Sequence, residues 1–180
     1  MMKDDTDDDA AIAQPTVPVC RTCGSTSVLL DAWAVWSIPK QHWELEATCD
    51  NGWCGTCDAE TRYFDWISLA EASARGIRRL NDAMRHGQIG PHDRLMMTAG
   101  VQMRGEVFVA AAVVALRAFD TFTVENDPSG HHDFGKLEVE GVPLYFKIDY
   151  YNLTLDAGSE DPADPSVTAR VLTILEPSEY

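Results

Sequence analysis

Two Cys-x2-Cys pairs constrain the fold of this chain more than any other feature of its sequence. The first pair is Cys20 and Cys23, the second is Cys54 and Cys57, and thirty residues lie between the pairs. Each pair can bring two thiolates to one point, and two such pairs supply the four sulfur ligands of a closed tetrahedral site. The spacing therefore predicts a metal centre, and we expect its ion to be a structural Zn²⁺.

The residues around these pairs are expected to form a zinc ribbon over 18–66. Branched and aromatic residues favour three short strands, at 28–36, 42–47 and 60–64, and the first two are expected to form a hairpin. A segment of this size cannot bury a sufficient core, so its fold must be stabilised by the bound metal, which links the two cysteine pairs. Its tryptophans are expected to divide between a small core and an exposed patch of the kind that interfaces use: Trp33, Trp36, Trp43 and Trp53.

Cys49 is the fifth cysteine, and a tetrahedral site has no place for it. We interpret it as a spare thiol that is buried or half-exposed. Two alternatives concern the four-cysteine set itself. An iron–sulfur centre would use the same four thiolates, so the sequence leaves iron open. A redox-active pair fits less well, because it requires one Cys-x-x-Cys at a helix N-terminus and here two pairs are joined by strands.

The chain is strongly acidic, with 29 acidic residues against 14 lysines and arginines and a net charge of −15. A charge of this sign repels nucleic-acid phosphates and anionic membranes, so both are disfavoured as partners. The exception is the stretch 67–118, which carries seven arginines against four acids. Residues 1–17 hold a run of aspartates with nothing to pack, and we expect them to form a disordered acidic tail.

The sequence also bears on the compartment. The longest apolar run, 107–116, is too short to span a membrane and is flanked by charge. The acidic N-terminus does not resemble a signal peptide. We therefore expect a cytoplasmic protein, in which thiols stay reduced and remain free to bind metal.

Two helices are expected in the remaining segment, 67–180. Ser68 and Glu71 have the spacing of a capping box, and the helix that follows them is expected to end at Gly87. A second helix is expected at about 103–118. The first of these helices carries a basic face formed by Arg75, Arg78, Arg79 and Arg85.

Strands are expected around these helices. They lie at 93–101, in a hairpin over 136–151 and at 167–176, where both faces are apolar, as in a central strand. The sequence therefore predicts an α+β fold. It consists of an N-terminal zinc ribbon of three short strands and a domain with two helices packed on a mainly antiparallel four-stranded sheet.

Polar residues of several kinds gather in the second half of the chain. Six of them are candidate catalytic residues: His131, His132, Asp133, Lys147, Asp149 and Arg170. The first three lie in a loop marked by glycine and proline, and the last three lie in expected strands. If they converge in a cleft, they can perform acid–base chemistry or bind a phosphate.

Structural roles account for the same residues. The Asn126-Asp127-Pro128 sequence has the composition of a turn, and His132 with Asp133 can lock the loop by hydrogen bonds. Lys147 and Asp149 lie on one face of a strand and suit an ion pair. The sequence has no nucleophile elbow and no phosphate-binding glycine loop. We therefore expect a protein that is not an enzyme, with a hydrolase-type activity through this loop and Arg170 as the alternative.

Five segments of the second half carry a family resemblance: IRRLNDAMR, RLMMTAGV, FDTFTVENDPSGHHDFG, FKIDYYN and GSEDPADPSVTARVLTILEPSEY. From about residue 76 on, the chain thereby resembles a bacterial family known as domain of unknown function 3768. One departure is Asn152, where the family tends to have an acid. The resemblance implies a fold unit and an association with mobile elements, but no reaction. The upstream segment is similar to a zinc-ribbon module found beside such domains.

Taken together, these features favour a non-catalytic protein-interaction module. Its acidic surface suits a positively charged site, and the resemblance favours a mobile-element-linked factor acting on a nucleic-acid-handling protein. The hydrolase-type enzyme is the first alternative. The second is a nucleic-acid binder that uses the ribbon and the helix from Arg75 to Arg85.

Overall fold

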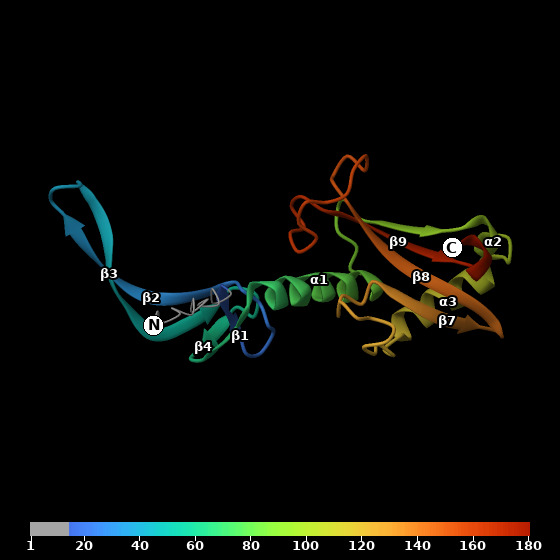
Figure 1. Ribbon diagram of the computed structural model, residues 1–180, viewed down its shortest axis with the longest axis horizontal. Coiled ribbons are helices and arrows are strands. Elements are labelled where there is room, and N and C mark those ends of the chain that lie inside the picture. Colours follow the sequence, from blue (N-terminus) through green and yellow to red (C-terminus); the bar gives the residue numbers. More distant parts are fainter. Residues whose placement is uncertain (1–14) are drawn as a thin grey trace, which may run out of the picture. The chain divides into compact units, whose positions relative to one another are not determined.

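The structure is a computed structural model, and it describes residues 15–180 (Figure 1). The chain divides into two compact units, Met1–Ala72 and Ser73–Tyr180, which are described separately below. Among the described residues, no helix combines the length and the apolar character that crossing a membrane requires.

The expected acidic tail, 1–17, lies outside the described residues over 1–14. Its last residues differ from the expectation, because Thr16 and Val17 already belong to a strand. The reason is local packing: Val17 lies against the small core of the first unit.

Within residues 15–72, five strands form two sheets: β1 (Thr16–Cys20), β2 (Val28–Ser37), β3 (His42–Cys54), β4 (Ala59–Thr61) and β5 (Phe64–Ser68). β2, β3 and β4 make one antiparallel sheet, and β1 and β5 pair antiparallel in the other. The expected hairpin is present as β2 and β3. The strand expected at 60–64 is in fact two strands, because β4 pairs with β3 whereas β5 pairs with β1.

The apolar core of the first unit is small. Its buried members are Val19, Ile67 and Ala72. The four tryptophans were expected to divide between this core and an exposed patch. All four are exposed, so the part of the expectation that concerns the core is wrong. Burying one aliphatic side chain contributes about 1.5–3 kcal/mol, whereas ordering each residue costs about 1–2 kcal/mol. So small an apolar cluster therefore cannot by itself hold this unit together.

The second unit is an α+β domain. Its elements are α1 (Leu69–Arg85, which begins in the first unit), β6 (Arg94–Met97), α2 (Ala99–Gln102), α3 (Glu106–Ala118), β7 (Phe134–Val139), β8 (Val142–Tyr151), β9 (Ala169–Leu175) and a short 3-10 helix (Pro177–Glu179). The sheet order is β6-β9-β8-β7, with only β6 and β9 parallel. The predicted α+β class and the mainly antiparallel four-stranded sheet are confirmed.

The strand expected at 93–101 is shorter than the sequence suggested, because it ends at Met97 and α2 follows. A contact remote in sequence explains the difference. The Glu179 carboxylate accepts hydrogen bonds from the Thr98 hydroxyl (2.6 Å) and from the Gly100 backbone N–H (3.1 Å). These bonds satisfy the start of a helical turn that the local sequence alone does not signal.

The core of the second unit lies between the sheet and the helices. Phe146 pairs with Ile174 and Ile148 pairs with Leu172 across β8 and β9, so these four side chains share one face. Helix α3 covers that face with Phe108, Ala112 and Leu116. Strand β9 is central and largely buried on both faces, as its sequence predicted.

Close packing at Gly135 yields the first prediction. A Cβ atom at Gly135 would lie 2.3 Å from Phe146 Cε1 and 2.8 Å from Phe119 Cε1. We expect Gly135→Ala to lower the free energy of unfolding by about 1–3 kcal/mol, because the aromatic rings would have to move. Urea unfolding followed by circular dichroism measures the change.

Gly158→Ala is the matched control for this prediction. A Cβ atom there meets nothing within 4 Å, and the φ angle is not in the left-handed region. We expect the control to change the unfolding free energy by less than about 0.5 kcal/mol. Equal stability of the two variants would show that Gly135 is not a packing position.

Candidate metal centre, polar cluster and apolar hairpin

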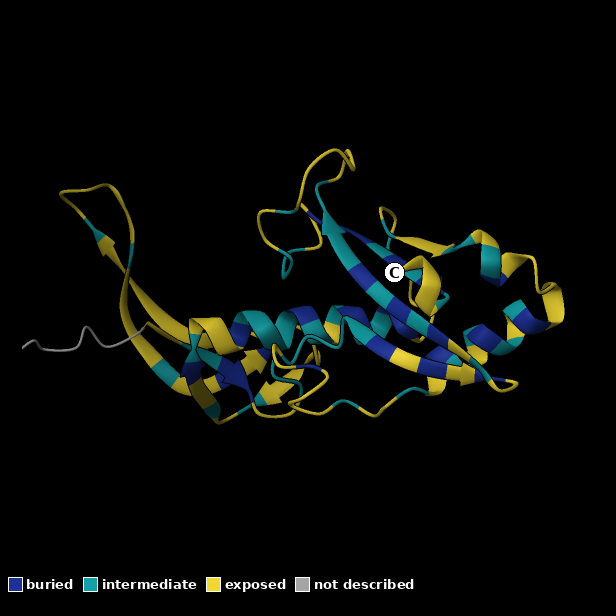
Figure 2. Ribbon diagram, turned by 45° about the vertical axis from the view of Figure 1, so that its right-hand side comes forward, coloured by how far each residue is buried: buried dark blue, intermediate teal, exposed yellow. Residues whose placement is uncertain are grey.

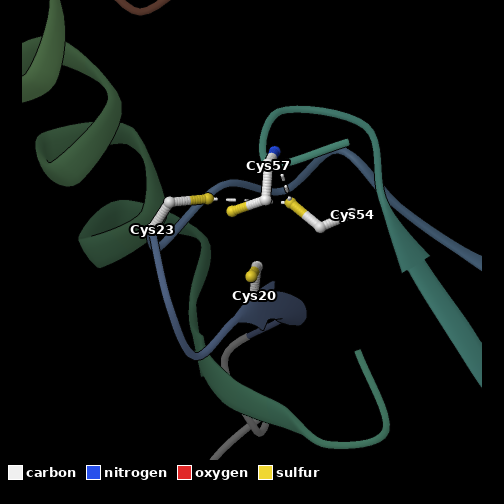
Figure 3. Close-up of side chains that lie close together, drawn as sticks. All are labelled: Cys20, Cys23, Cys54 and Cys57. Carbon is white, nitrogen blue, oxygen red and sulfur yellow. Dashed lines mark hydrogen bonds between the residues drawn. The ribbon is translucent and has the colours of Figure 1, made fainter. Parts of the chain in front are cut away.

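The four cysteines of the two pairs converge in the first unit. The sulfur atoms of Cys20, Cys23, Cys54 and Cys57 all lie within 4.8 Å of one another, and Figure 3 shows the side chains gathered around one point. The Cys23 and Cys54 sulfurs are 3.6 Å apart, which is far beyond a disulfide bond. A tetrahedron of sulfurs about 2.3 Å from a central ion has edges of about 3.8 Å. The four side chains can therefore hold a metal ion.

Backbone hydrogen bonds build each cysteine turn and tie the two turns together. The Gly24 N–H donates to the Cys20 carbonyl (2.8 Å), and Gly24 has a φ of 70°, which favours glycine. The Gly55 N–H donates to the Ser27 carbonyl (2.8 Å) and links the second turn to the first. A Cβ atom at Gly55 would lie 2.6 Å from Ser27 Oγ. The two glycines thus allow the close approach that the sulfur cluster requires.

The electrostatics of the cluster favour anionic sulfur at Cys20. The backbone N–H of Cys23 lowers the pKa of the Cys20 thiol to about 6, even though burial opposes ionisation. The hydrogen bond with Cys23 raises the pKa of the Cys57 thiol to about 12. Burial raises the pKa of the Cys23 thiol. Without a cation, these neighbours thus compete for protons, and a divalent ion would relieve that competition by binding the thiolates.

Cys49 does not belong to the sulfur cluster. It lies within β3, is partly buried, and lines a hollow of about 660 Å³ together with Leu30, Arg62 and Tyr63. All five cysteines are free of disulfide bonds. Cys49 therefore provides a matched control for experiments on the metal ligands.

The cluster predicts a metal dependence that is confined to the first unit. We expect about one metal ion per chain in protein purified under reducing conditions. Cys54→Ser should lose the ion, because three thiolates hold it far more weakly, whereas Cys49→Ser should keep it. Elemental analysis measures the metal, and amide NMR signals measure the fold of each unit.

The expected NMR result separates the two units. Loss of the ion should collapse the signals of the first unit and leave those of 94–175 dispersed, since apparent binding energies of about 10–16 kcal/mol maintain small zinc modules. Metal-free protein with an intact first unit would contradict the prediction. So would equal metal loss in the Cys49 and Cys54 variants.

The six candidate catalytic residues do not all converge. Asp133, Lys147 and Asp149 line one hollow of about 440 Å³, and His131 Nδ1 lies 3.7 Å from Asp133 Oδ2. Lys147 and Asp149 form an ion pair at 2.8 Å on one face of β8, and the hydrogen bond with Asp149 raises the pKa of Lys147. Arg170 lies opposite Tyr150 in the β8–β9 register, so it occupies the other face of the sheet. The alternation of strand side chains therefore separates Lys147 and Asp149 from Arg170.

Arg170 belongs to a buried hydrogen-bond chain. Its Nε donates to Asn81 Oδ1 (3.1 Å), and Asn81 Nδ2 donates to the Tyr150 hydroxyl (2.7 Å) and the His131 carbonyl (2.8 Å). The Tyr150 hydroxyl in turn donates to Asp133 Oδ2 (3.2 Å). Burial lowers the pKa of Arg170 and raises that of Tyr150. Asn81 thus joins helix α1 to the sheet and to the loop before β7.

A second polar group surrounds His132. Its Nδ1 lies 2.9 Å from Asp82 Oδ1, and its ring stacks on Phe122 with the centroids 3.7 Å apart. The Asp127 carboxylate accepts the backbone N–H groups of His131 (3.0 Å) and His132 (3.1 Å). These contacts are the loop-locking arrangement that the turn composition suggested.

Arg85 departs from its expected place on a basic helix face. It is buried, donates to the Phe119 carbonyl (2.7 Å) and pairs with Asp82 at 2.7 Å. The arginine face expected on α1 is thereby reduced to Arg75, Arg78 and Arg79. The reason is that Arg85 reaches the end of α3, where carbonyl groups need donors.

Sequence reasoning missed Asn81 and Asp82. A signal was present for Asn81, since it follows Ile77 by four residues and precedes Met84 by three, which places it on the apolar face of α1. A polar residue on an apolar helix face needs a buried partner. No comparable signal marks Asp82, whose partner His132 is fixed by the loop.

The Asn81 contacts predict a large effect on stability. Asn81→Ala removes one hydrogen-bond partner from each of Arg170, Tyr150 and the His131 carbonyl, and we expect a loss of about 2–4 kcal/mol in unfolding free energy. Gln88→Ala is the control, because Gln88 is an exposed amide just after the same helix. Chemical denaturation of both variants measures the difference in unfolding free energy. An Asn81 variant as stable as the control would show that the hydrogen bonds of Asn81 are dispensable for stability.

The β2–β3 hairpin exposes large apolar side chains on both faces. Trp36 and Trp43 are cross-strand partners with their rings 5.5 Å apart, edge to face. Val35 and Trp36 are neighbours in the regularly paired part of β2 and both are exposed, so both faces of the hairpin carry apolar side chains. The exposed apolar residues of the hairpin are Leu29, Leu30, Trp33, Val35, Trp36, Ile38, Trp43, Leu45 and Trp53. Figure 2 shows the two strands exposed over almost their whole length.

Comparison with known proteins relates only the second unit to a family. No curated protein and no solved structure matches the chain. Residues 97–179 match the model of the family described as protein of unknown function (DUF3768), and this match confirms the resemblance for that part of the chain.

Proposed function

We propose that this protein is a non-catalytic interaction protein, whose metal-stapled ribbon presents the β2–β3 hairpin to a protein partner. The exposure of the hairpin carries the proposal: Trp33 is 69% exposed and Trp43 is 66% exposed. Soluble monomers rarely expose large contiguous apolar patches, and tryptophan is a frequent anchor of interfaces.

We further propose that the ion in the sulfur cluster is Zn²⁺ in a structural role. Four thiolates around one point suit zinc, and a closed set of four ligands leaves no open position for a substrate. The ion therefore acts as a staple that fixes the ends of the hairpin. An iron centre would instead give a coloured protein with visible absorbance, so the spectrum of the purified protein distinguishes the two metals.

The proposed partner offers an apolar groove with a basic rim. The hairpin carries exposed carboxylates at Asp31, Glu46 and Asp50, and Lys40 is already paired with Glu44 at 2.5 Å. A basic rim would complement this charge and speed encounter. A nucleic-acid-handling protein carries such a basic surface. The association with mobile elements that the family resemblance implies also favours this class of partner.

The partners of the polar cluster support a non-catalytic role. Asp127, Asp133, Lys147, Asp149 and Arg170 each have an internal hydrogen-bond or ion-pair partner. The hydrolase alternative combined Lys147 and Asp149 with Arg170, whereas they lie on opposite faces of the sheet. The arrangement supports a structural role for these residues.

Trp33 provides the test of the proposed function. Candidates are captured from host extract with the full chain, and each captured protein is then purified and its dissociation constant measured. We expect Trp33→Ser to raise the dissociation constant for the true partner by tenfold or more, since an aromatic anchor contributes about 2 kcal/mol or more to the binding free energy. Val124→Ser, which removes an exposed apolar side chain from a loop of the second unit, should bind like the natural protein.

Two further measurements sharpen this test. Elemental analysis of the Trp33 variant must show the same metal content as the natural protein, so that weaker binding reports on the surface. Binding should also weaken as salt rises, because the proposed rim is basic. A partner that binds the Trp33 variant and the natural protein equally would refute the hairpin as the interface.

A further inference from the structure

Helix α3 is apolar on its outer face as well as on its inner face. Phe108, Ala112 and Leu116 are buried against the sheet. On the opposite side lie Val107, which is 80% exposed, and Val114, which is 66% exposed, with Ala110 between them. These three positions follow one another at helical spacing, so they form a continuous stripe. A helix that is apolar all round is normally covered on both sides.

Opposite charges stand at the two ends of this stripe. Glu106 begins α3 and Arg117 is in its last turn. Eleven residues make about three turns, so both side chains lie on the same flank of the helix, about 16 Å apart. Neither forms an ion pair with any residue in 15–180, although the Arg117 guanidinium lies close to Gly87.

We propose that the outer face of α3 binds the same face of a second copy of this chain, with the two helices antiparallel about a two-fold axis. A two-fold axis perpendicular to both helices reverses the direction of the helix but leaves its charged flank on the same side of the interface. Glu106 of each copy therefore faces Arg117 of the other. Each dimer then contains two such ion pairs, one at either end of the apolar stripe. A parallel two-fold pair would instead put the two Glu106 side chains at one end of the dimer and the two Arg117 side chains at the other, on opposite sides of the interface, so no Glu106 would face an Arg117.

The chemistry of the stripe suits this occupant. Ala110 near the centre lets two helix axes approach closely. The surrounding stretch, 67–118, is the one segment with more basic than acidic residues, so repulsion between two acidic chains is weakest there. A pair of helices this short buries less than the roughly 800 Å² per partner of a stable interface. The dimer is therefore weak and dissociates on dilution.

This dimer does not depend on the proposed function. The stripe lies in the second unit, whereas the hairpin that would bind a protein partner lies in the first. Loss of one interaction would leave the other unaffected. The two surfaces also differ in character, because the hairpin carries aromatic residues and the α3 face carries small aliphatic ones.

Sedimentation velocity of the full chain over a concentration series tests the dimer. We expect Val114→Glu to raise the dimer dissociation constant by about tenfold or more, because it places a charge in the apolar stripe. Glu106→Arg and Arg117→Glu should each weaken the dimer by several-fold, since each creates facing like charges. The double variant with both changes should restore it, because the ion pairs re-form with their signs exchanged.

Controls distinguish this interface from other modes of association. Val124→Glu introduces the same charge at an exposed valine outside α3 and should leave the dissociation constant unchanged. Circular dichroism and urea unfolding of every variant must match the natural chain. Monomers at every concentration would overturn the proposal, as would a dimer that survives Val114→Glu. A dimer lost in Trp33→Ser but kept in Val114→Glu would move the interface to the hairpin.

Discussion

The fold of the first unit depends on the meeting of four cysteine side chains at one point. Among the described residues its buried apolar cluster comprises Val19, Ile67 and Ala72, which is too little burial to offset the entropy of ordering the unit. The two cysteine turns meet at the two ends of the hairpin, and a metal ion held there would compensate for the small core. Because this cluster lies at the base of the hairpin, the hairpin's own side chains would not be needed for burial. Trp33, Trp36 and Trp43 can therefore face solvent.

In the second unit a polar residue has the organising role. Asn81 lies on the apolar side of α1 and is fully buried, and it bonds to the β9 arginine, the β8 tyrosine and the loop before β7. Leaving the buried Asn81 amide unpaired would cost more free energy than its hydrogen bonds contribute when they form. These bonds therefore allow a single position of α1 on the sheet. Histidines and carboxylates that have the composition of a catalytic site are thereby engaged in holding the loop.

The two proposed surfaces divide binding between the two units. An aromatic hairpin with acidic surroundings favours a different protein with basic groups, whereas the aliphatic stripe of α3 with one charge of each sign at its ends favours its own copy. Self-pairing would present two hairpins on one particle, and two linked sites bind a multivalent target more tightly than either site alone. Both surfaces follow from apolar residues that the folding of their own unit leaves unburied.

The sequence by itself determined the cluster of four cysteines, the β2–β3 hairpin, the two main helices and the central position of β9. Each of these rests on a local spacing: two residues between cysteines, alternation along strands and the helical repeat along α1 and α3. It also predicted the α+β class. The tertiary structure decided the rest, since that depends on partners distant along the chain. β5 is a separate strand from β4 because it pairs with β1. The hydrogen bonds to Glu179 stabilise a helical turn at 99–102. The alternation of side chains along β8 places Lys147 and Asp149 on the opposite face from Arg170. Arg85, which is buried, and the tryptophans, which are exposed, show the same limit of prediction from sequence. The type of a residue gives its preference for burial, but the surrounding structure decides whether it is buried.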